Sequence, residues 1–418
     1  MTHASLTIVL AMLTMVGALG IDTYLPAFHA IGADLQVGPL VVQQTLSVYV
    51  ACMAFTMLFS GTLSDSFGRR RVLLVSVIGY TLTSLAAALA PNAQALILVR
   101  ALQGLSAGAG LVVGRAMVQD LFKGAEAQRV MATITMVFSL APAIAPILGG
   151  VLQSLAGWRS IFVFMALYSA VLWVICQRGL PETLPPAQRS PFHLRQIAAR
   201  YLESLRQPAF VLMILAIAMI FGGLPLYIGS AASFVMDILG LPETAFGWLF
   251  IPLVAGTVAG AALARRLARQ VAPAKMLRAG MAVMLASAIA GALYASIWPV
   301  RIPYAVLPLM FYTFGLGLVM PAMVLRALGM FPHMRGLAAS MQSFVQMMTF
   351  SLVSGFIAPL VFHSAQLIAI GHLLFLLLGM ALWAWAMRIA PPPSLPPGGP
   401  GQPLSLIHIS EPTRLGMI

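Results

Sequence analysis

The sequence contains few charged residues. Only 8% of its 418 residues are Asp, Glu, Lys or Arg, whereas 61% are hydrophobic. A chain of this composition cannot cover a folded core with an ordinary solvated surface, which excludes a water-soluble globular protein. The scarcity of charge therefore predicts a membrane protein that crosses the bilayer several times.

Cysteine is scarce as well, and sequence motifs for catalysis are missing. Cys52 and Cys176 are far apart and lie in or beside apolar runs, so they offer no disulfide framework and no metal-ligand spacing, and we expect them to pack in the interior. No nucleotide-binding P-loop, zinc motif or nucleophile triad is present. We therefore expect no enzyme activity, no ATP drive, no metal site and no organic cofactor.

Long apolar runs dominate what is present. Twelve of them reach about the 20 residues that span a bilayer. They predict membrane-spanning helices at 5–27, 40–60, 72–91, 94–119, 129–153, 158–178, 209–232, 244–264, 276–298, 302–327, 337–361 and 366–388. The sequence thus favours an all-α membrane fold.

The runs fall into two sets of six. We expect one six-helix bundle at 1–178, a connecting loop at 179–208 with room for a surface helix, and a second bundle at 209–390. The proline- and glycine-rich tail, 391–418, is predicted to be disordered, and its last part, 405–418, looks non-native. Gly256, Gly260 and the arginines after them repeat the features around Gly61 about 200 residues later, so we interpret the bundles as pseudo-symmetric copies.

Basic residues are distributed unevenly between the loops. If the N-terminus lies inside, eighteen Lys and Arg residues fall in inner loops or at inner helix ends, and only Arg159 and Arg301 fall on the outer side. Under the positive-inside rule both termini are then cytoplasmic. The net charge of +13 reports this orientation and does not indicate nucleic-acid binding.

A polar island separates the second and third runs. Its sequence from Gly61 to Arg71, GTLSDSFGRRR, cannot lie in hydrocarbon, so we expect a loop with a tight turn at the membrane face. The spacing G-x-L-x-D-x-x-G-R-R-R resembles the loop between the second and third spans of the major facilitator superfamily. The island also has a purely topological interpretation, in which its arginines only hold the loop inside.

Further motifs resemble the same superfamily. The fourth run contains R-x-x-Q-G from Arg100 to Gly104, which resembles the signature of that family's fourth span. The fifth run resembles the antiporter signature, although Ala141 stands where a glycine is expected; its matching residues are Pro142, Pro146, Gly149 and Gly150. The segments 22–27 and 180–184, with Phe246-Gly247, are similar to the Bcr/CflA branch of multidrug:proton antiporters.

The resemblance implies mechanical roles for two of these motifs. The gating loop would comprise Gly61, Asp65, Gly68, Arg69 and Arg70. When the inner gate is closed, Asp65 would accept a hydrogen bond from a helix N-terminus or from an arginine of the other bundle. This contact would act as a latch worth roughly 1–3 kcal/mol. The prolines and glycines of the fifth span would let it bend and pack closely against its mate across the bundles, which closes an outer seam.

Asp22 and Arg100 are ionisable residues that lie inside predicted membrane spans. Both are predicted roughly 8 Å below the outer surface, so each should face the bundle interior. Burial favours the protonated form of Asp22 and an approaching cation favours the ionised form, so we predict that Asp22 and Arg100 couple drug export to proton entry. Two structural interpretations stay open, namely an Asp22–Arg100 ion pair and a capping role for Asp22 at the helix break before Pro26.

Candidates for a substrate cavity carry weaker signals. Amphipathic side chains within the spans are the type that a poorly specific cavity uses. The candidates are Tyr24, Gln44, Ser47, Tyr49, Gln103, Arg115, Phe138, Tyr227, Gln342 and Gln346. Arg115 has a second interpretation, in which it reaches the inner surface as a snorkelling side chain. His363 and His372 can titrate near neutral pH, but we expect neither to couple transport.

Together these features predict a monomeric, twelve-span transporter of the bacterial inner membrane. It would export small amphipathic or antibiotic-like molecules in exchange for protons, with the proton gradient as its energy source and no nucleic-acid partner. One alternative is proton-linked transport of a single metabolite, because fold does not fix substrate. The other is a membrane sensor or scaffold without transport, in which Asp22 would be replaceable.

Overall fold

The computed structural model describes residues 3–268, 270–331 and 334–390. All regular structure in these ranges is helical, and twelve helical segments are long and apolar enough to cross a bilayer. The predicted all-α architecture with twelve spans is therefore confirmed. The tail 391–418, predicted to be disordered, and Arg269, part of the basic-residue count, lie outside the described residues.

Six spans form the first half of the molecule. They are α1 (His3–Asp22) with η1 (Leu25–Ala27) and α2 (Phe28–Asp34), α3 (Pro39–Phe67), α4 (Arg69–Ala88), α5 (Ala93–Leu121), α6 (Gly124–Ala156) and α7 (Trp158–Gly179). Helix α5 is central, because it packs on α3, α4 and α1. A Cβ on Gly104 of α5 would collide with the backbone of Tyr49, so a small residue there allows α3 and α5 to approach closely.

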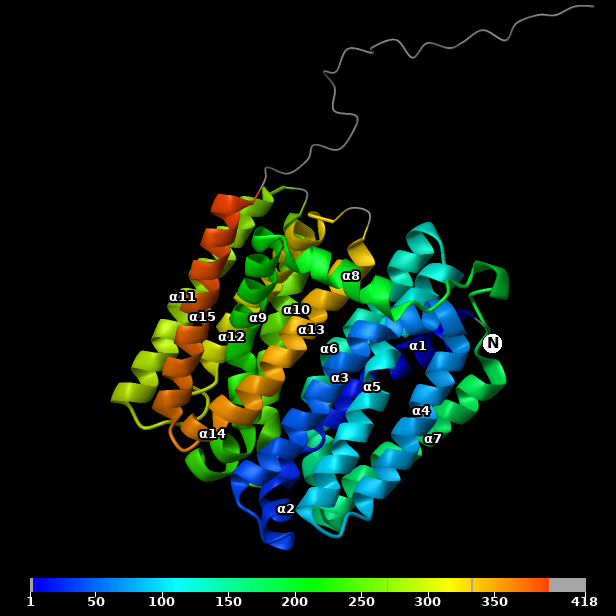
Figure 1. The fold of residues 1–418 in the computed structure, drawn as a ribbon. Coiled ribbons are helices and arrows are strands. Elements are labelled where there is room, and N and C mark those ends of the chain that lie inside the picture. The colour runs from blue at the N-terminus through cyan, green and yellow to red at the C-terminus, as the bar shows by residue number, and fades with distance from the viewer. Residues whose placement is uncertain (1–2, 269, 332–333, 391–418) are drawn as a thin grey trace, which may run out of the picture.

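Six more spans form the second half. They are α9 (Pro208–Gly229), which is followed by η3 (Ser233–Ile238), then η4 (Glu243–Phe246) with α10 (Gly247–Leu267), α11 (Pro273–Ile297), α12 (Leu307–Leu328), α13 (Arg335–Leu352) with η5 (Val353–Ile357) and α14 (Ala358–Val361), and α15 (Ala365–Ile389). Helix α9 packs on α15, and α12 packs on α10 and α11. Figure 1 shows the two halves side by side, the first in blue to cyan-green and the second in green to red.

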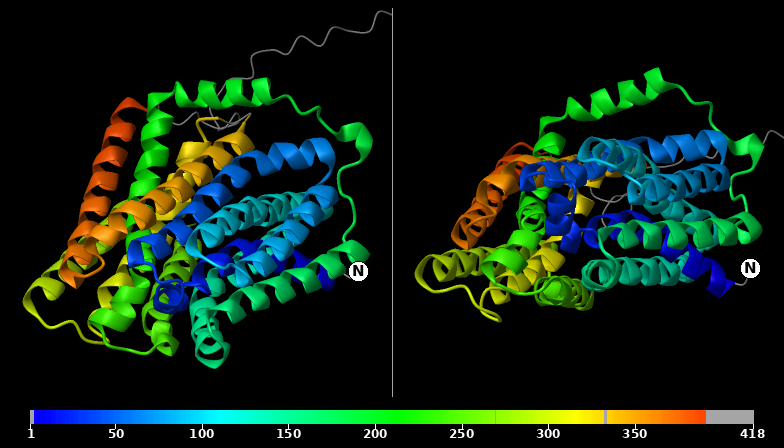
Figure 2. Two further views of the ribbon diagram at one scale, coloured as in Figure 1. Left: turned by 60° about the horizontal axis from the view of Figure 1, so that its bottom comes forward. Right: turned by 90° about the horizontal axis from the view of Figure 1, so that it is seen from below.

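An amphipathic helix connects the halves. After η2 (Pro186–Gln188), α8 (Leu194–Leu205) lies across the ends of the spans, as Figure 2 shows. Its inner face buries Ile197, Tyr201 and Ser204, and the Tyr201 hydroxyl donates to the Leu58 carbonyl of α3 at 2.7 Å. Burial raises the pKa of Tyr201 to about 12, so this phenol stays protonated and remains a donor at physiological pH.

The halves meet along a seam that is closed at one face of the molecule. Since the number of spans is even, α1 begins and α15 ends at the same face, called the terminal face here; the opposite one is the distal face. Helix α3 packs on α13, and α6 packs on α10. Near the distal face three hydrogen bonds join α3 to the α13–η5 segment: Gln43 Nε2 to Ser354 Oγ (2.8 Å), Gln44 Nε2 to Gly355 O (2.7 Å) and Ser47 Oγ to Ser351 O (2.8 Å).

The structure corrects two sequence-based boundaries. The island at 61–71 is not a loop, because α3 continues to Phe67 and α4 begins at Arg69, so Gly68 alone separates them. A helix that extends beyond hydrocarbon can carry polar side chains, and the chain turns only where glycine adopts a φ of +96°. The first helix also ends earlier than expected, at Asp22, because Pro26 follows and proline cannot continue a helix.

Candidate functional site

Arg100 is completely buried at the centre of the first half. Its exposed fraction is 0%, and its guanidinium donates to Gln103 Oε1 at 2.7 Å and to the Gly20 carbonyl at 2.9 Å. Gln103 in turn donates to Ser84 Oγ at 2.7 Å. The cation is thus held by a chain of polar groups from α1, α4 and α5.

Aromatic rings enclose the same guanidinium. Its central carbon lies 4.0 Å from the ring centroid of Tyr49, 4.6 Å from that of Tyr24 and 5.9 Å from that of Phe162. Ring faces attract cations, and this attraction strengthens when both groups are removed from water. Tyr24 is itself fixed by a 2.8 Å hydrogen bond between its hydroxyl and that of Thr45. These rings supply much of the stabilisation that a counter-ion would otherwise give.

The early end of α1 explains why Arg100 reaches a carbonyl. The last four carbonyls of a helix have no intrahelical partner and carry partial negative charge. Because α1 ends at Asp22, the Gly20 carbonyl belongs to this group, and Arg100 of α5 satisfies it. The end of one helix is therefore capped by an arginine from another.

Asp22 has no polar partner. Its exposed fraction is 4%, and its carboxyl forms no hydrogen bond or ion pair with any of the described residues. The Asp22–Arg100 ion pair is therefore not formed, and no side chain caps η1, so neither structural interpretation of Asp22 holds in this structure. Among the described residues, no group therefore stabilises a negative charge on this carboxyl.

A cluster of charges surrounds Gly68 at the terminal face. Arg69 donates to Asp65 Oδ1 at 2.6 Å and, through Nε, to Asp120 Oδ2 at 3.1 Å. Only 12% of the Arg69 side chain is exposed, so these contacts are partly shielded from solvent. Asp120, at the end of α5, was not among the residues predicted from the sequence.

The connecting segment joins this cluster. Glu182 accepts from the backbone N–H of Arg69 at 2.9 Å and lies 3.7 Å from the Arg189 guanidinium. Thr183 donates to Asp120 at 2.8 Å, and the Ser190 N–H donates to the Asp65 carbonyl at 3.1 Å. The gating-loop residues thus bind within the first half and its linker, and Asp65 forms no latch with any described residue of the second half.

Helix α6 provides a close contact at each of its two neighbouring glycines. A Cβ on Gly149 would collide with the Thr23 carbonyl of the same half, whereas one on Gly150 would collide with the Glu243 carbonyl of the second half. Pro142 and Pro146 lie within α6, which nevertheless runs unbroken from Gly124 to Ala156.

A hydrogen bond between two exposed side chains crosses the seam at the distal face. His29 Nε2 lies 3.1 Å from Asp237 Oδ1, with 42% and 53% of the two side chains exposed. The residues Gln44 and Ser47, expected in a cavity, hydrogen bond across the same seam. The distal side of the seam is therefore held by close backbone contacts and by hydrogen bonds from amide, hydroxyl and imidazole groups.

The remaining cavity candidates lie on several helices of both halves. Tyr24, Tyr49 and Gln103 belong to the buried Arg100 cluster. Tyr227 lines a small cavity in the second half beside His372, and Gln342 donates to Gln346 at 2.7 Å on α13. Arg115 is exposed on α5 and Phe138 is half-buried on α6. Among the described residues, no three His, Cys, Asp or Glu side chains are grouped to hold a metal ion.

Comparisons with known proteins agree with this architecture. Residues 10–359 match the family model described as Major Facilitator Superfamily. The chain is 30% identical to the bicyclomycin resistance protein homolog of Haemophilus influenzae, over 85% of this chain and 89% of that protein. It is 26% identical to multidrug resistance protein D of Escherichia coli, over 86% and 88% of the two chains. The crystal structure of the human organic anion transporter TETRAN has the same fold, with a TM-score of 0.65, 19% identity and coverage of 90% and 98%.

Proposed function

Because the chain belongs to the major facilitator superfamily, in the branch that includes bicyclomycin-resistance and multidrug-resistance proteins, we propose that it is a proton-coupled drug exporter. It carries small amphipathic or antibiotic-like molecules across the bacterial inner membrane by alternating access between its two faces. Helical halves that rock about a central site are the expected mechanism for such a duplicated scaffold.

The orientation of this exporter follows from charge. The terminal face carries the long basic stretches, including Arg69–Arg71 and the arginines of α8, whereas Arg159 and Arg301 are the basic residues on the described part of the distal face. We therefore assign the terminal face to the cytoplasm. With its hydrogen bonds concentrated at the distal end of the seam, this conformation corresponds to a transporter closed to the outside.

The unpaired, buried Asp22 is the observation that carries the proposal. In the outward-closed state none of the described groups stabilises its negative charge, so in this proposal the carboxyl holds a proton. Arg100 does not oppose this, because the guanidinium is already bound by the Gly20 carbonyl, Gln103 and aromatic rings. Asp22 first releases its proton to the cytoplasm. A drug that is cationic or carries several hydrogen-bond donors then binds and stabilises the resulting carboxylate. When the transporter later opens to the outside, the drug leaves and a proton from outside binds Asp22 in its place. One proton enters for each drug that this carboxylate releases.

Proton movement in everted membrane vesicles tests this mechanism. A panel of antibiotics and dyes is added to vesicles that hold an imposed proton gradient, and the intact chain is compared with Asp22→Asn. We expect drug addition to dissipate the gradient with the intact chain and at least tenfold more slowly with Asp22→Asn. Glu203→Gln removes an exposed acid from α8 and serves as the matched control, with a response equal to that of the intact chain.

Three other outcomes would each redirect the proposal. A response that survives in Asp22→Asn means that another group carries the proton. A response to one compound among many indicates a transporter of a specific metabolite. No response from correctly inserted intact protein contradicts drug export itself and favours a sensor or scaffold.

A further inference from the structure

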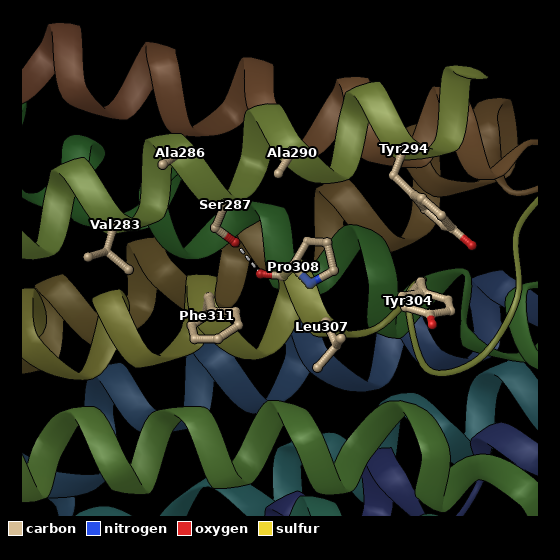
Figure 3. Close-up of a pocket in the computed structure, with 9 residues that line it drawn as sticks. All are labelled: Val283, Ala286, Ser287, Ala290, Tyr294, Tyr304, Leu307, Pro308 and Phe311. Atoms are coloured by element: carbon tan, nitrogen blue, oxygen red, sulfur yellow. Dashed lines mark hydrogen bonds between the residues drawn. The ribbon is translucent and has the colours of Figure 1, made fainter. Parts of the chain in front are cut away.

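A groove runs along the membrane-facing surface of the second half, between α11 and α12. Its volume is about 530 Å³, which lies in the range of sites for small organic ligands. Figure 3 shows its floor and walls: Ala286 and Ala290 come from α11, and Leu307, Pro308 and Phe311 come from α12. The groove exists because two alanines face the gap, where larger side chains would fill it.

The lining of the groove selects an uncharged, apolar ligand. None of its nine lining residues is charged, and the Ser287 hydroxyl on its floor already donates to the Pro308 carbonyl. Exposed hydrophobic side chains such as Ile289 and Leu293 lie on the neighbouring surface of α11. Both helices are membrane spans, so this surface contacts hydrocarbon, and the ligand must enter the groove from the bilayer.

The distal end of the groove is lined by aromatic rings that carry hydroxyl groups. Two tyrosines face each other there, with the ring centroids of Tyr294 and Tyr304 6.4 Å apart. The Tyr294 hydroxyl donates to the Pro299 carbonyl at 3.0 Å and accepts from the Arg301 N–H at 3.1 Å. Together with Trp298, which stacks on Tyr294, these rings match the aromatic belt at a membrane–water interface.

Two hydrogen-bonding groups at this end have no partner within the described part of the chain. The Tyr304 side chain is 62% exposed, and neither its hydroxyl nor the Arg301 guanidinium has a hydrogen-bond or ion-pair partner among the described residues. The other distal arginine differs, because Arg159 binds Asp34 at 2.6 Å and stacks on Trp158. Arg301 is therefore the distal-face cation that remains available to an external anion.

We propose that this groove is a binding site for a glycerophospholipid of the distal leaflet. One acyl chain lies along Ala286, Ala290 and Phe311, where the lining is apolar and continuous with the bilayer. The phosphate group sits at the distal end, where Arg301 supplies a charge-assisted hydrogen bond and Tyr304 a second donor. Neither the site nor its ligand depends on the transported drug, so the inference stands apart from the proposed export function.

Native mass spectrometry of the full chain, delipidated in detergent, tests the assignment. Two probes are compared, dioleoyl phosphatidylglycerol and dioleoylglycerol, which share acyl chains but differ in the phosphate. We expect Arg301→Gln to bind phosphatidylglycerol at least fivefold more weakly and dioleoylglycerol as the intact chain does. Arg278→Gln, which removes an arginine from the terminal end of α11, is the matched control and should bind both probes normally.

A second set of variants tests the groove itself. Ala290→Trp should fill it and weaken binding of both lipids at least fivefold, and the milder Ala286→Leu should act in the same direction if the tryptophan impairs folding. Equal losses in Arg301→Gln and Arg278→Gln would show that the phosphate is not bound here. Unchanged binding of dioleoylglycerol in both groove variants would show that the acyl chain lies elsewhere.

Discussion

The contact between Gly150 and the second half makes the conformational balance sensitive to a single methyl group. In Gly150→Ala, the new Cβ would collide with the Glu243 carbonyl oxygen and lie 3.1 Å from Thr244 Cα. Both atoms are backbone and cannot rotate away, so either the halves separate at the distal face or α6 shifts. Overpacking of this kind costs roughly 1–3 kcal/mol, and a bias of that size changes an equilibrium about 5- to 150-fold.

Distances between spin labels can measure this shift. Labels are placed at Leu155 on α6 and Leu360 on α14, whose exposed fractions are 79% and 77%, in a background with Cys52→Ser and Cys176→Ser. The intact chain should give one main distance for the closed distal seam. Gly150→Ala should add a longer distance, and its population relative to the shorter one should rise about 5- to 150-fold.

The neighbouring glycine provides a matched control. Gly149→Ala creates a clash of similar severity with the Thr23 carbonyl, but both partners belong to the first half. It should lower the unfolding temperature without lengthening the label distance. If Gly150→Ala leaves the distance distribution unchanged in a folded protein, or if both variants lengthen it equally, then the seam contact does not control opening and our reasoning is wrong.

Three further predictions concern the charged groups and the turn. Arg100→Lys should reduce drug-evoked proton movement at least tenfold, because an ammonium cannot both stack on the rings and reach Gln103 and the Gly20 carbonyl; an active lysine variant in the vesicle assay would contradict this. Gly68→Ala should destabilise the protein by roughly 1–3 kcal/mol in thermal unfolding, because φ and ψ there are +96° and +143°, a backbone conformation that essentially only glycine adopts, and an unchanged unfolding temperature would refute it. His29→Gln should change the population ratio of the two label distances by no more than about fivefold, because an exposed contact between His29 and Asp237 contributes at most about 1 kcal/mol even when it is charged; complete opening would mean that this contact dominates the seam.

Hydropathy and run length were sufficient to predict the twelve spans, because hydrocarbon forces every backbone polar group into a helix. The same reasoning failed at 61–67, where polar residues were taken for a loop. Outside hydrocarbon, polarity no longer distinguishes helix from loop, and only the single glycine at position 68 marks the turn.

The site was predictable in part. Depth along the helices indicated that Asp22 and Arg100 face the interior, and both are buried. Their lack of contact was not predictable, because it depends on α1 ending at Asp22 and thereby exposing the Gly20 carbonyl to Arg100. The contacts of Asp120 and Glu182 were missed because they also depend on which helix ends meet in the folded chain. One signal was present in the sequence: it has only ten acidic residues, and these two follow or end membrane spans on the same side of the membrane as the basic island.

The path of the connecting segment limits how far the halves can travel. Its first part is held by the first half up to Ser190, through Glu182, Thr183 and the backbone bond to Asp65. Helix α8 begins at Leu194 and packs on α9 of the second half. Phe192, which lies between Ser190 and Leu194, packs on Phe67 of the first half, with ring centroids 6.2 Å apart, and Tyr201 of α8 donates to the Leu58 carbonyl of α3. From Ser190 to Leu194 the chain makes four residue steps, which reach at most about 14 Å when fully extended. A swing that moves α8 away from α3 must therefore break the Tyr201–Leu58 hydrogen bond, and one beyond that reach must also separate α8 from α9 or Glu182 from Arg69, so the hold of a peripheral helix limits the stroke of the transporter.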